Sequence, residues 1–174
     1  MNKEENPVYS RDVLEFTTVA VQYCAYLENS EGRERAEFVD TMSKLLPLLY
    51  LKATILPNYE TFNDEFPPEC VTEENYDIIR NNVAYIMAEL DDYLDVFVED
   101  MKYSDSPILM TISENLADIY QELKNFAYTY KMGVEEDMMS AIMICKQNFI
   151  TDWGQKLANV LRAIHEVKYN ADNE

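Results

Sequence analysis

The sequence contains only three glycines, Gly32, Gly133 and Gly154, in 174 residues. Phosphate-binding loops need several closely spaced glycines, because their backbone N–H groups must come very close to the phosphate. These isolated glycines exclude the P-loop and the glycine-rich fingerprint of dinucleotide-binding folds.

Cysteine and histidine are also scarce. Cys24, Cys70 and Cys145 are widely spaced without a CxxC pair, and His165 is the only histidine. This number and spacing fit neither a zinc or redox site nor a disulfide framework, so we expect three free thiols. The sequence predicts no cofactor.

Long apolar runs are missing, although 48% of the residues are hydrophobic. A membrane span needs about 18 to 20 nearly uninterrupted apolar residues, and no segment approaches this length. The N-terminal residues MNKEENPVYSRD are polar and lack the apolar region of a signal peptide. We therefore expect a cytoplasmic protein that does not associate with membranes.

Positive charge is the remaining deficit, with 14 basic residues against 33 acidic ones and a formal net charge of −19. A surface this acidic repels phosphate backbones, so direct binding of nucleic acid is not expected. Basic proteins and cations are the favoured partners. The simplest alternative is that the charge only keeps the protein soluble.

Helical periodicity is the main positive feature. Apolar residues recur at three- and four-residue spacing along most of the chain, as one face of a helix requires. No segment alternates like a half-buried strand over more than about four residues. The sequence predicts an all-α single-domain bundle of about six or seven helices over residues 10–169, with flexible ends at 1–9 and 170–174.

The most regular segment runs from 111 to 133. Thr111 and Glu114 form a T-x-x-E capping box, an unbroken apolar stripe follows, and Gly133 stands where a C′ glycine ends a helix. Two further apolar stripes come after it. Gly154 predicts a bend between these stripes, because glycine within a helix costs about 1 kcal/mol relative to alanine.

Three features interrupt the helical pattern upstream. Pro47 lies within the apolar run 38–56 and predicts a kink or two shorter helices. Prolines among polar residues at 57–71 predict a loop. Thr72 is expected to cap the next helix, and the pattern over 73–102 fits one helix or two.

Several segments resemble a domain-of-unknown-function family of small acidic bacterial proteins. The resemblance covers nearly the whole chain. It implies an all-helical intracellular protein without an assigned activity, so no catalytic or ligand-binding residue can be transferred. The segments that carry it are DDYLDVF (91–97), ISENLADIYQELKNF (112–126), Tyr130, Gly133, Phe149, Trp153-Gly154 and Leu161-Arg162-Ala163.

The first candidate site combines a row of carboxylates on the helix after Thr111 with polar and aromatic groups on the last helix. A cleft between the two would suit a small-ligand binder or an enzyme that uses a histidine base. The simpler expectation is that the carboxylates pair with Lys156 or Arg162. A dimetal site is excluded, because it needs two Glu-x-x-His motifs. The residues are Glu114, Asp118 and Glu122 on one side, and Trp153, Arg162 and His165 on the other.

The second candidate site is an acidic patch of Asp91, Asp92, Asp95 and Glu99. On a helix, the first, third and fourth of these share one face, where like charges cost a few tenths of a kcal/mol per pair. Such repulsion favours a cation or a basic partner, although a solvated acidic face is the simpler interpretation. The chain lacks the DxDxDG loop of a calcium site, and no metal is predicted.

Thirteen tyrosines add residues that are common at recognition surfaces. Together these features favour a non-enzymatic acidic helical module that binds a basic protein partner. Two alternatives stay open, namely the small-ligand binder or enzyme described above and a nucleic-acid mimic that occupies a basic groove. An exposed apolar Met or Leu face would indicate a homodimer.

Overall fold

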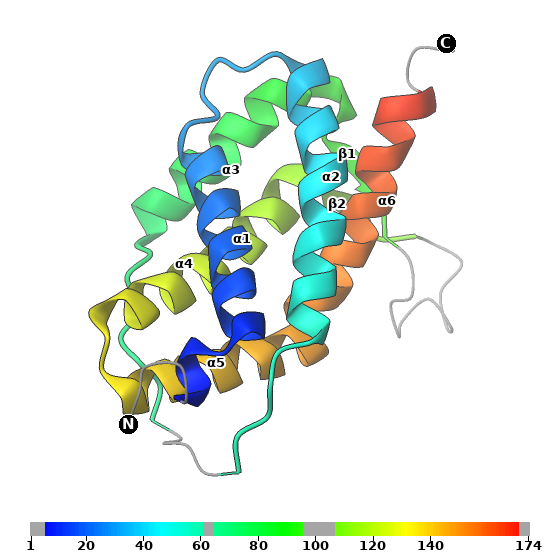
Figure 1. The fold of residues 1–174 in the computed structure, drawn as a ribbon. Coiled ribbons are helices and arrows are strands. Elements are labelled where there is room, and N and C mark those ends of the chain that lie inside the picture. Colours follow the sequence, from blue (N-terminus) through cyan, green and yellow to red (C-terminus); the bar gives the residue numbers. More distant parts are fainter. Residues whose placement is uncertain (1–5, 61–64, 96–106, 171–174) are drawn as a thin grey trace.

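The computed structural model describes residues 6–60, 65–95 and 107–170. Helix α5, a short π-helical segment and α6 follow one another without a break, so the described residues form five continuous long helices, slightly fewer than the predicted six or seven. Figure 1 shows how they are arranged. The predicted all-α fold is confirmed. The α-helices are α1 (Arg11–Glu28), α2 (Arg35–Thr54), α3 (Glu73–Met87), α4 (Ile112–Met132), α5 (Glu135–Asn148) and α6 (Gly154–Asn170).

Helix α4 lies at the centre of the fold and packs against α1, α3, α5 and α6. Thr111 caps its first turn, because the Thr111 hydroxyl accepts a hydrogen bond from the Glu114 N–H at 3.2 Å. Gly133 ends it with a left-handed φ of 77°. Both predicted end signals are therefore confirmed, as is Thr72, which accepts from the Asn75 N–H at the start of α3.

An aromatic cluster fills the space between α1, α4 and the π-helical segment η5 (Phe149–Trp153). Phe16 is fully buried, and its ring centroid lies 5.3 Å from that of Phe126 and 6.5 Å from that of Trp153. Buried Tyr23 of α1 donates a hydrogen bond to the Leu116 carbonyl of α4 at 2.8 Å. These contacts hold α1 against the central helix.

Pro47 does not divide α2, which continues through it from Arg35 to Thr54. The expectation of two shorter helices is therefore wrong. Pro47 is exposed, so water can hydrate the Ser43 carbonyl that loses its helical N–H partner. Buried residues on the opposite side of α2, including Leu46 and Leu49, pack into the core and favour a continuous helix.

Helix α3 ends well before 102, which corrects the expectation of one or two helices over 73–102. Ala88 follows the helix with φ 48° and ψ −122°, a conformation that disrupts the helical hydrogen-bond pattern. The short 3₁₀ helix η3 (Ala88–Leu90) and strand β1 (Asp92–Leu94) come next. Strand β1 pairs antiparallel with β2 (Leu109–Thr111), so the described chain also contains a two-stranded sheet that the sequence pattern did not reveal.

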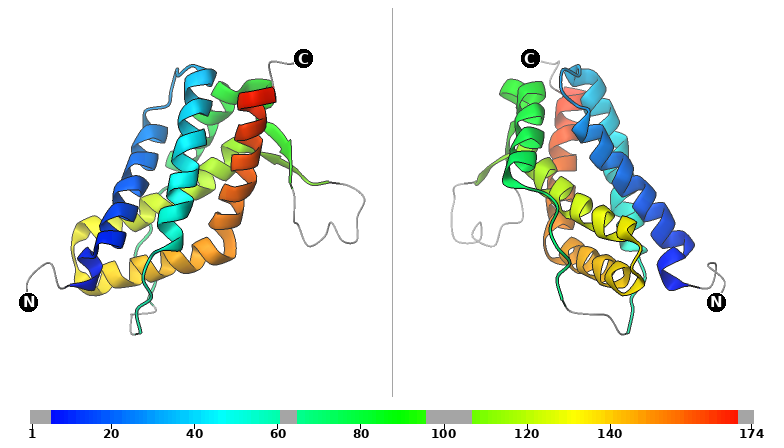
Figure 2. Two further views of the ribbon diagram at one scale, coloured as in Figure 1. Left: turned by 45° about the vertical axis from the view of Figure 1, so that its right-hand side comes forward. Right: turned by 90° about the vertical axis from the view of Figure 1, so that its left-hand side faces the viewer.

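The predicted bend near Gly154 corresponds to η5, which joins α5 to α6. A Cβ at Gly154 would lie 2.4 Å from the Phe149 carbonyl oxygen and 2.8 Å from the Phe149 ring. Glycine is therefore needed here for space. In two further views, α5 lies across one end of the molecule and α6 rises beside α2 (Figure 2).

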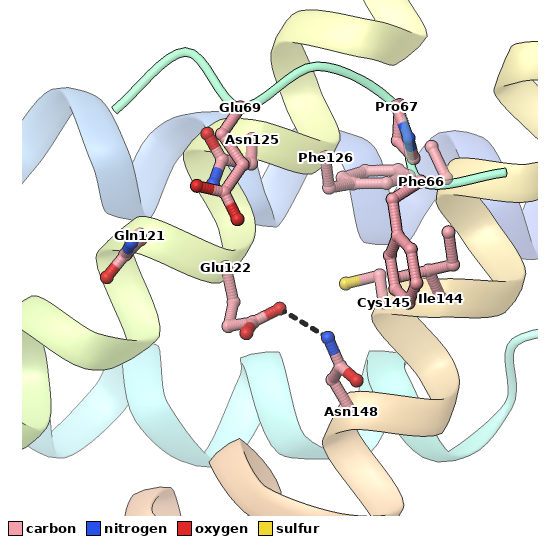
Figure 3. Close-up of a pocket in the computed structure, with 11 residues that line it drawn as sticks. Phe66, Pro67, Glu69, Gln121, Glu122, Asn125, Phe126, Ile144, Cys145 and Asn148 are labelled. Atoms are coloured by element: carbon pink, nitrogen blue, oxygen red, sulfur yellow. Dashed lines mark hydrogen bonds between the residues drawn. The ribbon is translucent and has the colours of Figure 1, made fainter. Parts of the chain in front are cut away.

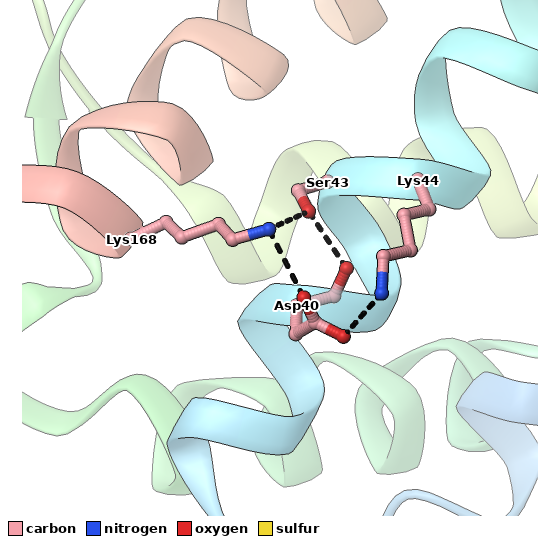
Figure 4. Close-up of polar contacts among 4 residues, drawn as sticks. All are labelled: Asp40, Ser43, Lys44 and Lys168. Atoms are coloured by element: carbon pink, nitrogen blue, oxygen red, sulfur yellow. Dashed lines mark hydrogen bonds and ion pairs between the residues drawn. The ribbon is translucent and has the colours of Figure 1, made fainter.

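Polar contacts hold the second half of α6 against α2 (Figure 4). Lys168 donates to Asp40 at 3.0 Å and to the Ser43 hydroxyl at 2.9 Å, while Lys44 lies 2.7 Å from the other Asp40 oxygen. The hydrogen bonds from these two lysines lower the pKa of Asp40.

Within the described ranges, no helix combines the length and apolar character that a membrane crossing requires. The cytoplasmic location stays a prediction. The outer face of α2 exposes Leu48 and Leu51, and Ile55 is exposed directly after the helix. An exposed apolar face of this kind is expected for a homodimer, but the dimer stays a prediction.

Candidate functional site

The carboxylate row on α4 separates into three different environments. Glu114 is exposed in the first turn. Asp118 accepts a hydrogen bond from Tyr76 at 2.6 Å and lies 2.9 Å from the Lys156 ammonium, so it makes the lysine pairing that the sequence predicted. Glu122 is the only member of the row that lines a pocket among those described below.

The predicted partners on the last helix lie apart from this row. Trp153 is fully buried and donates its indole N–H to the Cys145 carbonyl at 3.0 Å. Arg162 is exposed and donates to the Leu94 carbonyl at 2.5 Å, and His165 is exposed with its ring 4.7 Å from that of Tyr169. The structure does not gather these three residues and the carboxylate row around one cleft.

The acidic patch does not lie on one face of a helix, because Asp91 follows η3, Asp92 belongs to β1 and Asp95 follows β1. Asp92 is exposed, and Asp95 accepts a hydrogen bond from the Asn159 side chain at 2.7 Å. Glu99 lies outside the described residues. The helix on which that interpretation depended is therefore absent at Asp91, Asp92 and Asp95.

Asp91 has a structural role. It is only 8% exposed, and its two carboxylate oxygens accept from the Ser113 N–H at 2.8 Å and from the Ser113 hydroxyl at 2.6 Å. Its backbone carbonyl also accepts from the Ile112 N–H at 2.8 Å. A carboxylate at the N-terminus of a long helix is stabilised by the free N–H groups and by the helix dipole. Asp91 therefore anchors α4 to the turn after α3.

The pocket beside Glu122 is lined by residues of α4, α5 and the segment 66–69 and has a volume of about 260 Å³. Figure 3 shows the Glu122 and Asn148 side chains pointing toward each other from α4 and α5, with Glu69 on the segment that passes α4 near Asn125. Asn148 donates to Glu122 at 2.9 Å. The lining residues of this Glu122 pocket are Phe66, Pro67, Glu69, Gln121, Glu122, Asn125, Phe126, Ala141, Ile144, Cys145 and Asn148.

The Glu122 pocket is negative and only partly solvated. Burial raises the pKa of Glu122, and the hydrogen bond from Asn148 opposes this effect. Repulsion from Asp152 raises the pKa further, attraction to Lys156, which lies outside the pocket lining, lowers it, and repulsion from Glu69 raises it. None of the described residues that line the pocket is a lysine, arginine or histidine. The negative charge of Glu122 therefore has no basic partner in the pocket.

Asn125 of α4 holds the segment that covers the pocket. Its side-chain oxygen accepts from the backbone N–H groups of Cys70 at 2.8 Å and Val71 at 3.1 Å. The sequence pattern indicated Glu122 but gave no signal for Glu69, Asn125 and Asn148, because these residues come from separate segments with no motif that links them. Only the packing of α4, α5 and the connecting segment brings them together.

Among the described residues, no group of three or more histidine, cysteine, aspartate and glutamate side chains could hold a metal ion. Burial raises the pKa of Cys145 and, less strongly, that of Cys70, which keeps both thiols protonated. The Glu122 pocket therefore offers charge and shape rather than an activated nucleophile.

The fold and the pocket define a small all-α protein with an acidic pocket between two helices. The chain belongs to the family described as Domain of unknown function (DUF5063), whose model matches residues 7–170. It is also similar to the crystal structure of protein BF1032 from Bacteroides fragilis, with 46% identity, 94% of this chain and 96% of that chain covered, and a TM-score of 0.83. A search of curated proteins found no match.

Proposed function

We propose that this protein is a non-enzymatic interaction module that binds a basic segment of a protein partner. In this proposal a lysine or arginine side chain of the partner enters the Glu122 pocket. The observation that carries it is a half-buried carboxylate beside an apolar wall, with a second carboxylate on Glu69 and no basic residue in the lining. Lysine and arginine suit this arrangement, because each has a long apolar stem and a cationic head.

The walls of the pocket support the same class of partner. Phe126, Ile144 and Cys145 supply apolar surface for the stem. Phe66 lies at the pocket and is 82% exposed, so its ring is available to a cation or to an apolar group of the partner. An exposed aromatic ring next to a negative pocket is typical of recognition surfaces.

The net charge acts over a longer range. A charge of −19 accelerates the approach of a basic partner at low salt, and screening weakens this attraction as the ionic strength rises. Among the described residues, no specific arrangement favours an enzyme or a nucleic-acid mimic over this interpretation. Both alternatives stay predictions.

The test uses a labelled peptide in which lysines alternate with serine and glycine, and the same peptide with acetylated lysines. Fluorescence anisotropy measures the binding of each at low and high salt. We expect saturable binding of the lysine peptide only, with about tenfold weaker binding to Glu122→Gln, as for the loss of a partly desolvated ion pair. Binding should strengthen as the pH rises through the pKa of Glu122, because a bound cation favours the ionised carboxylate.

Glu31→Gln is the matched control. Glu31 is exposed in the α1–α2 connection, at the opposite end of the molecule from α5 (Figure 1), and its substitution changes the net charge by the same amount. We expect this variant to bind within about twofold of the wild type, as for a solvated surface charge. Equal losses in Glu31→Gln and Glu122→Gln would show that only the overall charge matters, and the pocket would then have no role.

A further inference from the structure

Asn115, in the first turns of α4, is buried without full hydrogen bonding. It is 1% exposed, and its side-chain nitrogen donates to the Tyr93 hydroxyl. Its side-chain oxygen has no hydrogen-bond partner among the residues that the structure describes. If the amide is turned around, Tyr93 donates to the oxygen and the nitrogen loses its partner instead. In either orientation, one end of this amide has unused hydrogen-bonding capacity.

A separate cavity of about 210 Å³ adjoins Asn115, between α4, α6 and the end of β1. A second buried amide, Asn159 at 7% exposure, donates to Asp95 at 2.7 Å in the same place. Buried polar groups that converge from several elements on one small cavity are typical of a ligand site. The residues that line this Asn115 cavity are Asp95, Met110, Asn115, Thr151, Asp152, Gln155, Lys156 and Asn159.

The cavity lining contains two carboxylates and one basic residue. Asp95 and Asp152 supply carboxylate oxygens, and Asn115 supplies an unpaired amide oxygen. Lys156 is the basic residue of the lining, and its ammonium already lies 2.9 Å from Asp118 and 3.1 Å from Asp152. A ligand that complements these groups must donate hydrogen bonds and can carry positive charge.

We propose that the Asn115 cavity binds a small organic cation with N–H donors, either a primary ammonium or a guanidinium compound. A metal ion fits less well, because Asp95 and Asp152 already accept hydrogen bonds from Asn159 and Lys156, whereas sites of hard cations need several carboxylate oxygens as direct ligands. The proposal does not depend on the Glu122 pocket, since the two sets of lining residues do not overlap.

The test measures binding of butylammonium and methylguanidinium by side-chain amide signals in ¹H–¹⁵N NMR spectra. Tetramethylammonium is the control probe, because it carries the charge but has no N–H donor. We expect saturable shifts of the Asn115 and Asn159 amide signals with the two donor probes only. Asn115→Leu should weaken their binding by at least about tenfold, because the site then lacks its amide acceptor.

Stability measurements separate a binding role from a structural one. Asn6 is the matched control, since it lines neither pocket, is 8% exposed and accepts a hydrogen bond from the Val8 N–H through its side-chain oxygen at 3.1 Å. Asn6→Leu should lower the melting temperature and leave probe binding intact. The double variant with Asn115→Leu and Tyr93→Phe removes both partners of a buried hydrogen bond in which one end of the Asn115 amide has no partner. The melting temperature of this variant should therefore equal or exceed that of the wild type.

Three results would overturn the proposal. The first is equal binding of the donor probes to the wild type and to Asn115→Leu. The second is a drop in melting temperature for the double variant as large as that for Asn6→Leu, which would make Asn115 a structural residue. The third is saturation of the wild type with tetramethylammonium, Mg²⁺ or Ca²⁺ but not with the donor probes.

Discussion

Replacement of Asp91 by alanine tests whether this aspartate is a structural anchor or part of a binding surface. The substitution removes both hydrogen bonds that Ser113 donates to the carboxylate and leaves the Ser113 N–H and hydroxyl buried without these acceptors. Loss of an N-cap typically costs about 0.5–2 kcal/mol, and a hydrogen bond to a charged group contributes about 1.5–3 kcal/mol. These contributions overlap, so we expect a loss of roughly 2–4 kcal/mol in the free energy of unfolding.

Urea denaturation followed by circular dichroism measures this loss as a lower midpoint with an unchanged slope. For a chain of this length, the melting temperature should fall by roughly 5–15 °C. Asp91→Asn should lose less than Asp91→Ala, because the amide oxygen can still accept one of the two hydrogen bonds.

Asp92→Ala is the matched control, because Asp92 is the next residue and is exposed on β1. We expect a change within about 0.5 kcal/mol for this variant. The anchoring role of Asp91 would be refuted if the two alanine variants were equally stable. If Asp91→Ala also weakened binding of the lysine peptide while stability was unchanged, Asp91 would instead belong to an acidic recognition surface.

Two further predictions concern Glu122 and Ala88. Folding raises the pKa of Glu122. The contribution of the Glu122 carboxyl to stability is therefore complete at a pH below its pKa in the unfolded chain, and it is lost as the pH rises through its pKa in the folded protein. Glu122→Gln should therefore be more stable than the wild type at neutral pH, with no such gain near pH 4; a pH-independent difference in denaturation midpoints would contradict the burial argument. Ala88→Gly should stabilise the protein by about 1 kcal/mol in the same assay, because glycine adopts the positive φ without strain and the Ala88 methyl is exposed. A loss of stability would show that the Ala88 methyl makes a necessary contact.

The tyrosines show how a correct compositional observation led to an incomplete interpretation. Their abundance suggested a recognition surface, yet several hydroxyls connect distant segments of the fold. Tyr59 donates to the Pro7 carbonyl at 3.1 Å, Tyr130 to the Val8 carbonyl at 2.7 Å and Tyr120 to Glu28 at 2.9 Å. An amphipathic side chain serves equally well at a partner surface and at a contact between helices, and composition does not distinguish the two.

The sequence by itself determined the elements whose signals are local. The all-α class followed from apolar periodicity, because that spacing buries one face of a helix. The start of α3 at Thr72 and both ends of α4 followed from capping chemistry, in which a side chain satisfies the N–H groups of its own first turn or a glycine adopts a left-handed φ. The pairing of Asp118 with Lys156 was also predicted, because the carboxylates on the helix after Thr111 were expected to pair with Lys156 or Arg162 on the last helix.

Only the tertiary structure decided the features that depend on distant partners. Alanine is the best helix former, yet α3 ends at Met87 and Ala88 leaves the helix. Just beyond it, Asp91 reaches the N-terminus of α4 and β1 pairs with β2. These long-range contacts outweigh a local preference of a few tenths of a kcal/mol per residue. The Glu122 pocket and the Asn115 cavity arise in the same way, because their charge and hydrogen-bonding capacity come from segments that no local pattern links.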